Sequence, residues 1–543
     1  MKKLKILKSL LLLLLAVIVL LSGCGKTGNP TVDGIPTGSG NGVLEGEITF
    51  PLEEEVTFRV ITALKDGSES HDGKKMFEEI KQKTNVNIIW EHYQQSAWAE
   101  IKRLVFAGKD MPDMFAGQNV FTIDDIVSYA EQGFFIPLEG MIEEYAPNVQ
   151  KIFTRRPDFK RDLTMPNGHI YSLFTFLEDK NVSADTLMIN GNWLDYLKLE
   201  MPKTTDDFYS VLKAFKTGDP NQNNKFDDEI PFTFRHNVTG QGLMSMFGAF
   251  GIIDNGNHMT VKDDKVIYTS IQPEYRDGLV YFNKLFKEGL ADVEALTHSV
   301  SVYNAKTTIK EKENMIAGTF VRWQNLGSFG GEDVGIRYVP PLEGPKGHRL
   351  WRIEEPELTS KSAFTITTVC KQPELALKWV DMFYDEKTSF EMKYGIIGDV
   401  VKENPDGSFE FMETPEGEIA LDWRGKDING MFIYNVWSEW TNRFVLDPIA
   451  RDKILADEMY RPFGGGYKKL PNFTMAPDVA EEVSMLETDL KNFVNDSIAI
   501  FLLEGGAEDD SKWNAYLKKC EDMKMSRMLE LYQQLYDRQY GLD

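Results

Sequence analysis

The succession strand–helix–strand in residues 56–91 constrains the fold of this chain more than any other feature. Residues 56–62 (VTFRVIT) predict a strand, residues 74–84 an amphipathic helix, and residues 86–91 a second strand. Such a unit is typical of parallel strands that carry their connecting helix on one face of the sheet. The sequence therefore predicts an α/β fold with a parallel sheet.

The same pattern continues and indicates a ligand-binding edge. Residues 97–107 predict a helix, and residues 114–117 predict a short strand. In open parallel sheets, ligands bind beyond the carboxyl ends of the strands. Gln118 and Asn119 come directly after this strand, so we expect both side chains to contact a ligand.

A second block of strands and helices predicts a second domain, which a chain of 543 residues also favours. Residues 186–190 predict a strand, and residues 315–321 predict another that we expect to return to the first block. The expected helices cover residues 193–197, 205–216, 275–287, 373–384, 478–503 and 512–540.

The N-terminus predicts export. Four lysines in residues 1–9 precede an apolar run at residues 10–21, which is shorter than the about 20 residues of a membrane-spanning helix. We therefore interpret residues 1–23 as a signal peptide. The order Leu-Ser-Gly-Cys at residues 21–24 resembles the bacterial lipobox, which implies a lipid on Cys24 as the first mature residue. The alternative is an ordinary secretory signal followed by a chance cysteine.

Residues 24–46 are rich in Gly, Thr and Ser and lack the apolar surface that folding requires. We expect them to form a flexible tether. Lipid at one end of such a tether would hold a soluble body at the outer face of the cell membrane without inserting it.

The composition limits the partners. The formal net charge is −24, and removal of the signal lysines makes it more negative, which argues against nucleic acid or anionic lipid as a ligand. After Cys24 only Cys370 and Cys520 remain, so a disulfide scaffold is excluded. These two cysteines either pair with each other or stay as buried thiols.

Residues 219–229 (DPNQNNKFDDE) predict a calcium-binding loop. Oxygen-bearing side chains stand at positions 1, 3, 5 and 9, position 7 offers a backbone carbonyl, and two more carboxylates follow. The ligand candidates are Asp219, Asn221, Asn223, Lys225 through its carbonyl, Asp227, Asp228 and Glu229. Position 6 is Asn224 instead of the EF-hand glycine, but Asn tolerates the left-handed backbone that this position needs. The alternative is an Asx-rich surface turn.

Several stretches together resemble the family 1 extracellular solute-binding lipoproteins of ABC importers, in particular the oligosaccharide-binding group that includes alginate-oligosaccharide binders. They are AGKDMPD (107–113), MINGNWLDYLKLEMPKTTDDFYSVLKAFKTGDPNQNNKFDDEIPF (188–232), YRDGLVYFNKLFKEGLADVEALT (275–297), CKQPELALKWVDMFYDEKTSFEMKYGIIG (370–398) and LYQQLYDRQY (531–540). The resemblance implies a structural Ca²⁺ in the loop and leaves open whether Asp228 or Glu229 completes its ligands.

The resemblance also implies an α/β two-lobed fold of the periplasmic-binding-protein type (type II), with the ligand cleft between the lobes and closure about a hinge. We expect residues 47–165 and 308–368 in the N-terminal lobe, and residues 170–305 and 370–543 in the C-terminal lobe. The implied function is that of a monomeric receptor that delivers an oligosaccharide to an ABC permease.

A sugar-binding cleft needs flat aromatic rings for the CH faces of the sugar and polar groups for its hydroxyls. Besides Gln118 and Asn119, the candidates are Trp98, Tyr171, Trp323, Trp351, Trp437 and Trp440. For each of these aromatic residues the alternative is a half-buried ring that only stabilises the fold. Trp90 and Trp379 lie in apolar patterns, and we expect them in the core.

An enzyme is not expected. A glycosidase needs two carboxylates at a defined separation, but the chain has no Gly-x-Ser-x-Gly or His-Glu-x-x-His motif, and its seven histidines do not cluster. The remaining alternatives to an oligosaccharide receptor are a binder of another solute class, such as a peptide, and a glycan-binding surface lipoprotein without a role in transport.

Overall fold

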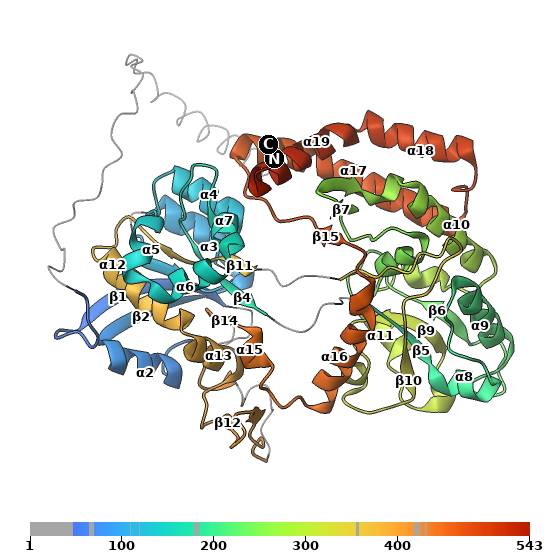
Figure 1. Ribbon diagram of the computed structural model, residues 1–543, viewed down its shortest axis with the longest axis horizontal. Coiled ribbons are helices and arrows are strands. Elements are labelled where there is room, and N and C mark those ends of the chain that lie inside the picture. The colour runs from blue at the N-terminus through green and yellow to red at the C-terminus, as the bar shows by residue number, and fades with distance from the viewer. Residues whose placement is uncertain are drawn as a thin grey trace, which may run out of the picture. The chain divides into compact units, whose positions relative to one another are not determined.

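The strands of the computed structural model form two separate sheets, each inside its own hydrophobic core. We call the elements around the six-stranded sheet the first body and those around the four-stranded sheet the second body (Figure 1). The structure describes residues 47–64, 70–108, 110–118, 120–178, 183, 185–353, 358–416, 423, 425–428 and 432–542. The predicted signal peptide, Cys24, the tether at residues 24–46 and Asn119 lie outside these residues.

The first body has a mixed sheet with the strand order β14-β4-β11-β3-β1-β2. Its strands are β1 (Val56–Leu64), β2 (Val86–Gln94), β3 (Met114–Ala116), β4 (Leu173–Leu177), β11 (Leu358–Ile366) and β14 (Asn435–Val436). Strand β1 pairs in parallel with both β2 and β3, which confirms the predicted parallel sheet. Strand β11 runs antiparallel to β3 and β4.

Helices and one hairpin complete the first body. They are α2 (Lys75–Thr84), α3 (Gln95–Ala107), α4 (Ile123–Glu131), α5 (Glu139–Tyr145), α6 (Pro147–Arg155), α7 (Pro157–Leu163), α12 (Pro373–Asp381), α13 (Glu386–Tyr394), α15 (Ser438–Thr441) and the strands β12 (Val401–Glu403) and β13 (Phe409–Phe411). Helix α2 is amphipathic and buries Met76, Phe77 and Ile80 in the core, as its periodicity predicts.

The second body is built on the sheet β10-β5-β9-β6, with β5 antiparallel to both of its neighbours. Its strands are β5 (Thr186–Asn190), β6 (Ile230–Thr233), β9 (Ala317–Arg322) and β10 (Ile336–Val339), and a smaller sheet contains β7 (Met259–Lys262), β8 (Lys265–Tyr268) and β15 (Tyr467–Lys469). Its helices are α8 (Gly191–Leu197), α9 (Thr205–Thr217), α10 (Pro273–Lys287), α11 (Val300–Thr307), α16 (Pro448–Tyr460), α17 (Pro477–Leu503), α18 (Asp510–Asp522) and α19 (Met525–Tyr540). Short 3₁₀ turns join these elements.

Local sequence signals explain several helix boundaries. Helix α9 begins with a capping box, in which Thr204 accepts a hydrogen bond from the backbone N–H of Asp207 and the Asp207 carboxylate accepts one from the backbone N–H of Thr204. The predicted helix at residues 512–540 is instead two helices, α18 and α19. The chain turns between them at Lys524, whose φ of 64° is left-handed and incompatible with a continuous helix.

The predicted lobe boundaries are wrong. Strand β9 pairs with β5 and β6, so residues 308–353 belong to the second body and do not return to the first. Strand β11 and residues up to 441 belong to the first body. The chain therefore passes between the bodies at three connections, between β4 and β5, between β10 and β11, and between α15 and α16. We call them the first, second and third crossing segments; their described residues include Ser183 and Asp185 in the first, Arg352 in the second and residues 442–447 in the third. An apolar run identifies a buried strand but does not identify its partner, which explains the error.

Cys370 and Cys520 are both free and buried, and they lie in different hydrophobic cores. Burial raises the pKa of the Cys370 thiol to about 12 and that of Cys520 to about 11. Both thiols are therefore protonated at neutral pH and act as small core side chains. Among the described helices, none combines the length and the apolar character that crossing a membrane requires.

Candidate functional site

Trp323 lies at a cavity of about 500 Å³ that both bodies line. The residue follows the carboxyl end of β9, and 45% of its surface is exposed, which is rare for tryptophan in this protein. The second body also contributes Gln324, Ile449, Ala450, Lys453 and Ile454, and the first body contributes Tyr394, Glu410, Phe411, Thr441 and Phe444. Four aromatic rings and a few polar groups around one concave space suit a sugar. We call this space the Trp323 cavity.

The charged groups of the Trp323 cavity are each engaged by a protein partner. Glu410 forms an ion pair with Lys402 at 2.5 Å. Asp447 caps helix α16 by accepting a hydrogen bond of 2.8 Å from the backbone N–H of Ala450. Lys453 is paired with Asp457. Because Glu410 and Lys453 are paired with opposite charges and Asp447 is engaged in the helix cap, the cavity suits a neutral, hydroxyl-rich ligand better than an ionised one.

The Lys453 ammonium contacts one face of the Trp323 ring. It lies 5.2 Å from the ring centroid, in the range of a cation–π contact. Only 2% of the Lys453 side chain and 1% of the Asp457 side chain are exposed, so this ion pair is nearly free of water. The same ammonium donates a hydrogen bond of 2.8 Å to the main-chain oxygen of Ser183, in the first crossing segment.

A second cavity, of about 640 Å³, lies mostly in the second body. Its polar lining includes Asn255, Asn257, Thr260 and Thr488, and aromatic rings come from Tyr467, Phe473 and Tyr532; Asp124 of helix α4 is a contributor from the first body. Several of these polar groups already have partners: the Tyr532 hydroxyl donates to Glu487 at 2.9 Å, and Asn257 accepts from Lys491 at 2.7 Å.

The lining of this second cavity includes Asp254, which contacts the buried histidine His258. His258 faces the Asp254 carboxylate at 3.1 Å through Nδ1 and the Asn495 side-chain oxygen at 3.0 Å through Nε2. Burial alone would lower the pKa of His258, but Asp254 and Asn495 outweigh it and raise that pKa above its ordinary value. Burial, together with the nearby charge of His258, lowers the pKa of His236 to about 4.

Four of the predicted cleft residues are core residues. Trp98 is 3% exposed, and its indole N–H donates to the main-chain oxygen of Val120 at 2.6 Å. Tyr171 is 7% exposed, and its hydroxyl accepts from Asn167 at 3.1 Å. These two predictions are wrong because the polar neighbours in the sequence lie at the surface while the rings turn inward.

Trp351 and Trp437 are buried as well, so they do not line a cleft. Trp351 is 2% exposed, stacks on Tyr460 and donates its indole N–H to the main-chain oxygen of Asp185 at 2.8 Å. Trp437 is 3% exposed and lies under the Arg155 guanidinium, 3.6 Å from its ring centroid. Their hydrogen bonds and ring contacts hold the fold together.

Trp440 and Gln118 are half-buried, and their side-chain N–H groups donate hydrogen bonds to other protein groups. The Trp440 ring stacks on Phe409, and its indole N–H donates to Glu386 at 3.0 Å, so it supports the hairpin next to the Trp323 cavity. Gln118 donates to the main-chain oxygen of Phe432 at 2.9 Å. Trp379 is 1% exposed, which confirms it as core, and Trp90 is half-buried against the same core.

The sequence analysis missed most of the Trp323 cavity. Tyr394 comes from α13, Phe411 from β13, Lys453 from α16 and Phe444 from the segment between α15 and α16, and no spacing in the sequence relates them. The signal that was present was the polar context of Trp323 after an apolar strand. The other contributors depend on how the two bodies are joined.

The predicted calcium loop joins α9 to β6 and folds around its own oxygen atoms. Asp219, Gln222 and Asn224 have φ values of 45°, 60° and 63°, so Asn224 adopts the left-handed conformation expected at position 6. The Asn223 side-chain oxygen accepts from the backbone N–H of Lys225 at 2.8 Å, and its amide donates to Asp228 at 2.8 Å.

Several buried oxygens of this loop have no hydrogen-bond partner among the described residues: one oxygen each of Asp219 and Asp228 and both oxygens of Glu229. Burial, together with the charges of Asp228, Asp219 and Asp227, raises the pKa of Glu229. Unpartnered buried oxygens that repel one another are the donor set a hard cation requires. The residues therefore fit Ca²⁺, and both Asp228 and Glu229 face inward with an unused oxygen.

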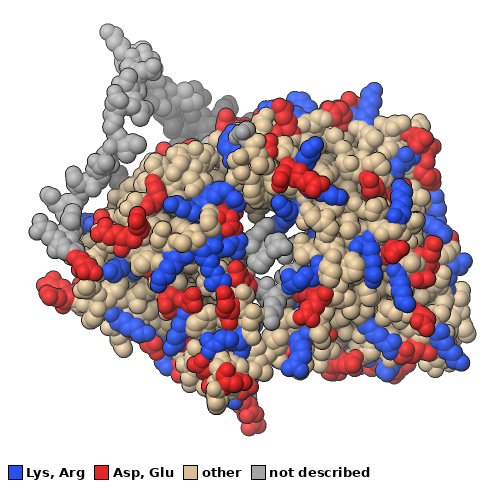
Figure 2. Space-filling model, viewed as in Figure 1, with Lys and Arg blue, Asp and Glu red and all other residues tan. Residues whose placement is uncertain are grey.

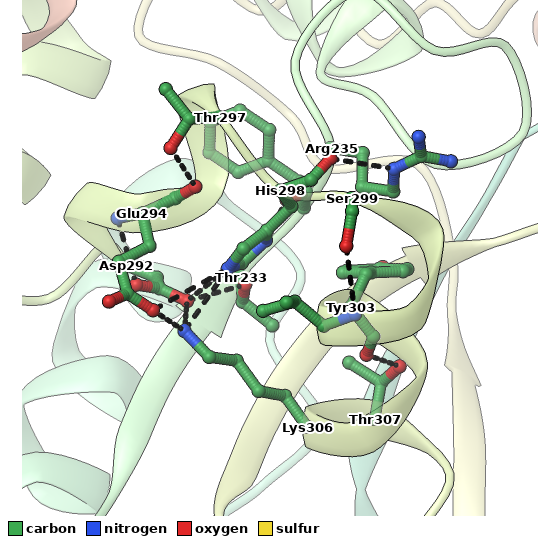
Figure 3. Close-up of polar contacts among 12 residues, drawn as sticks. Thr233, Arg235, Asp292, Glu294, Thr297, His298, Ser299, Tyr303, Lys306 and Thr307 are labelled. Atoms are coloured by element: carbon green, nitrogen blue, oxygen red, sulfur yellow. Dashed lines mark hydrogen bonds and ion pairs between the residues drawn. The ribbon is translucent and has the colours of Figure 1, made fainter.

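A different acidic cluster is already filled by a protein cation. Ligand-type atoms of Asp292, Glu294 and His298 lie within 4.8 Å of one another. The Lys306 ammonium lies among them, 2.8 Å from Asp292, 2.6 Å from Glu294 and 3.1 Å from His298 Nε2 (Figure 3). His298 Nδ1 faces the main-chain oxygen of Phe234 at 3.1 Å, which leaves Nε2 as the acceptor. The ammonium thus takes the place that a metal ion would need.

Basic and acidic side chains are intermixed over the face of the molecule in Figure 2. Exposed ion pairs of the molecule include Arg337 with Asp195 and Lys346 with Asp277. This distribution agrees with the net charge of −24 and favours solubility.

Comparison with known proteins relates this geometry to one family. The family model for the bacterial extracellular solute-binding protein matches residues 68–389. The fructooligosaccharide ABC transporter substrate-binding protein FusA of Streptococcus pneumoniae is 30% identical, with 97% of each chain covered. Lipoprotein LipO of Bacillus subtilis is 24% identical over 68% of this chain and 72% of LipO.

Solved structures of similar proteins agree with this family assignment. S. pneumoniae FusA in complex with kestose has a TM-score of 0.72 and 28% identity, covering 90% of this chain and all of that chain; an EF-hand mutant of FusA, in complex with fructo-nystose, matches equally well. The alginate-binding protein AlgQ2 without calcium ion shares the fold, with a TM-score of 0.63 and 21% identity, over 91% of this chain and all of that chain. These matches confirm the periplasmic-binding-protein type of fold. The chain belongs to the bacterial extracellular solute-binding proteins, a family that binds solutes outside the cell and does not catalyse reactions.

Proposed function

We propose that this protein captures a neutral oligosaccharide of the fructooligosaccharide class and delivers it to the permease of an ABC importer. The observation that carries the proposal is the Trp323 cavity, where an exposed tryptophan ring offers stacking and the charged side chains are engaged by protein partners. The full-length similarity to FusA supports this ligand class.

A panel of ligands tests the proposal. We expect kestose and nystose to bind the protein in isothermal titration calorimetry, and oligogalacturonides and short peptides to give no heat, because the cavity has no unpaired cation for a carboxylate among its described residues. Trp323→Ala should weaken the binding strongly. Binding of peptides without binding of any sugar would show that the ligand class is wrong.

The role in transport needs a separate experiment. Deletion of the gene should abolish growth on the bound oligosaccharide, and purification of the protein from membranes should recover permease subunits. A protein that binds the sugar but whose loss leaves uptake unchanged would be a glycan-binding surface lipoprotein, the alternative that the sequence leaves open.

We also propose that Cys24 carries the lipid anchor and that residues 24–46 tether the body to the outer face of the membrane. The similarity to lipoprotein LipO supports this location. Cys24→Ala should release the protein into the culture medium. Retention of this variant in the membrane fraction would contradict lipid anchoring at Cys24.

The loop at residues 219–229 is proposed to hold a structural Ca²⁺. Asp219, Asn221, Asn223, Asp227, Asp228 and Glu229 would contribute side-chain oxygens, and Lys225 its carbonyl. The ion would neutralise the mutual repulsion of the carboxylates and join α9 to β6. The loop contributes no residue to the Trp323 cavity, so its expected effect is on stability.

A further inference from the structure

We infer that Lys453 is a positioning residue that couples the Trp323 ring to the first crossing segment, so that occupation of the cavity is transmitted to the connection between the two bodies. This inference rests on the proposed function, because it assigns a role to the Trp323 cavity. Three observations carry it: the burial of the Lys453–Asp457 pair, its contacts with Ser183 and its position against the ring.

Helix α16 binds both main-chain polar groups of Ser183, its N–H and its carbonyl. The Ser183 backbone N–H donates to Asp457 Oδ1 at 3.0 Å, and the Ser183 carbonyl accepts from the Lys453 ammonium at 2.8 Å. Lys453 and Asp457 are four residues apart, so both side chains project from the same face of α16. The first crossing segment is therefore attached to the helix that begins directly after the third crossing segment.

The first and second crossing segments are attached to each other as well. The Trp351 indole N–H donates to the Ser183 hydroxyl at 3.3 Å and to the Asp185 carbonyl at 2.8 Å. Ser183 thus receives contacts from Lys453, Asp457 and Trp351, which lie next to the other two crossing segments. Because all of these groups are buried and closely packed, a displacement of Lys453 would also displace Ser183.

Trp323 links this junction to the cavity. One face of the ring meets the Lys453 ammonium, and the exposed part of the ring lines the cavity. A sugar that stacks on the ring fixes its orientation, and the ring in turn fixes the ammonium that holds Ser183. Lys453 itself does not need to touch the ligand to act in this way.

Hydrogen exchange of the ligand-free protein is the first test. Lys453→Met should increase the exchange of the Ser183 amide by about tenfold relative to the amides of β5, because Asp457 loses the ammonium that orients it. The control variant Lys213→Met removes an exposed lysine over Tyr209 on helix α9 and should leave the Ser183 amide unchanged. Unchanged exchange in Lys453→Met would overturn the inference.

A double-mutant cycle on kestose affinity is the second test. We expect Trp323→Ala and Lys453→Met each to weaken binding about tenfold or more, and the double variant to be no weaker than about the weaker single variant, because both changes break one connection. Independent effects, which multiply in the double variant, would overturn the inference. Lys453→Arg, which keeps the charge, should retain most of the affinity.

Two additional experiments cover a Lys453 variant that does not fold and a wild-type protein that does not bind the sugar. If Lys453→Met does not fold, the pair is replaced together in Lys453→Met/Asp457→Leu, which leaves no unpaired buried charge and should still expose the Ser183 amide to exchange. If the wild-type protein binds neither kestose nor nystose, the proposed function fails, whereas the exchange experiment without ligand still decides whether Lys453 holds the crossing segment.

Discussion

The Arg352 guanidinium lies 3.2 Å from the Asp185 carboxylate, and both side chains are buried at the boundary between the crossing segments and the second body. Asp185 also accepts hydrogen bonds from the backbone N–H of Gly240 and the hydroxyl of Ser245, each at 2.5 Å. One carboxylate therefore joins the first crossing segment, the second crossing segment and the loop after β6. The geometry of this junction depends on a charge that the surrounding protein keeps from water.

Removal of this carboxylate should be costly. Asp185→Ala removes a buried carboxylate that pairs with the Arg352 guanidinium and accepts hydrogen bonds from Gly240 and Ser245, so we expect the free energy of unfolding to fall by about 3–5 kcal/mol. Urea denaturation followed by circular dichroism measures this change. Asp195→Ala, which breaks an exposed pair with Arg337, is the matched control and should change stability by less than about 1 kcal/mol. Equal effects of the two substitutions would contradict the structural role of Asp185.

The two tryptophans Trp323 and Trp351 should respond in opposite ways. Trp323→Ala removes a ring that is 45% exposed, so it should strongly weaken sugar binding at little cost in stability. Trp351→Ala removes a ring that is 2% exposed and should cost about 3–5 kcal/mol. Calorimetric titration and thermal unfolding of both variants give the comparison. A large stability loss in Trp323→Ala would show that this ring serves the fold instead of the ligand.

Calcium should stabilise the protein through the loop at residues 219–229. EDTA should lower the melting temperature by on the order of several degrees, and Ca²⁺ should restore it, because an ion that binds only the folded state stabilises it by mass action. Glu229→Gln should lose most of this response, since both carboxylate oxygens are buried without partners. Asp406→Asn, in an exposed turn, should respond like the wild type. A melting temperature that ignores both EDTA and Ca²⁺ would contradict the proposed ion site.

His258 should make stability depend on pH. Its folded-state pKa is raised, so the protonated ring stabilises the folded state. This contribution is fully present below the unfolded pKa of about 6.5 and is lost as the pH rises through the higher folded pKa. The difference in unfolding free energy between wild type and His258→Gln should therefore shrink as the pH increases from 6 to above that value. His348→Gln, at an exposed position, is the control. A constant difference would mean that His258 acts only by packing.

His236 should make the stability of the protein depend on pH in the acidic range. Burial lowers the pKa of His236 to about 4, so the neutral ring is the form that the folded state accepts. Its contribution is present above pH about 6.5 and is lost as the pH falls towards 4, because the unfolded chain takes up the proton first. His236→Gln should flatten this part of the curve in urea denaturation at pH 4–7. The prediction is wrong if the unfolding free energy of His236→Gln depends on pH between 4 and 7 in the same way as that of the wild type.

Lys306 should be replaceable by a metal ion. Lys306→Met removes the ammonium from Asp292, Glu294 and His298, and we expect a loss of about 3 kcal/mol. The three ligand atoms that remain lie within 4.8 Å of one another, so Zn²⁺ should raise the melting temperature of this variant but not that of the wild type. Lys306→Met/His298→Gln should lose the gain. An equal effect of Zn²⁺ on wild type and variant would show that the ammonium does not occupy the position.

The succession of elements follows from local patterns, and the sequence predicts it well. The strands at residues 56–64, 86–94 and 186–190 and the helices α9, α10 and α17 lie where periodicity and caps place them, with ends that differ by a few residues. The calcium loop is equally local, because its oxygens come from eleven consecutive residues. The resemblance to solute-binding proteins also rests on contiguous stretches, and the comparisons confirm it.

Tertiary structure alone decides which residues share a body and which ring meets a ligand. Strand β9 reads as a buried strand, but only its hydrogen bonds to β5 and β6 assign it to the second body. Trp98, Trp351 and Trp437 have sequence contexts as polar as that of Trp323, yet their rings are buried and Trp323 alone of these four is exposed. The physical reason is the separation along the chain over which each kind of interaction acts. Capping hydrogen bonds and side-chain periodicity act over a few residues, whereas the Trp323 cavity arises where Trp323, Phe411 and Lys453 meet from segments far apart in the chain.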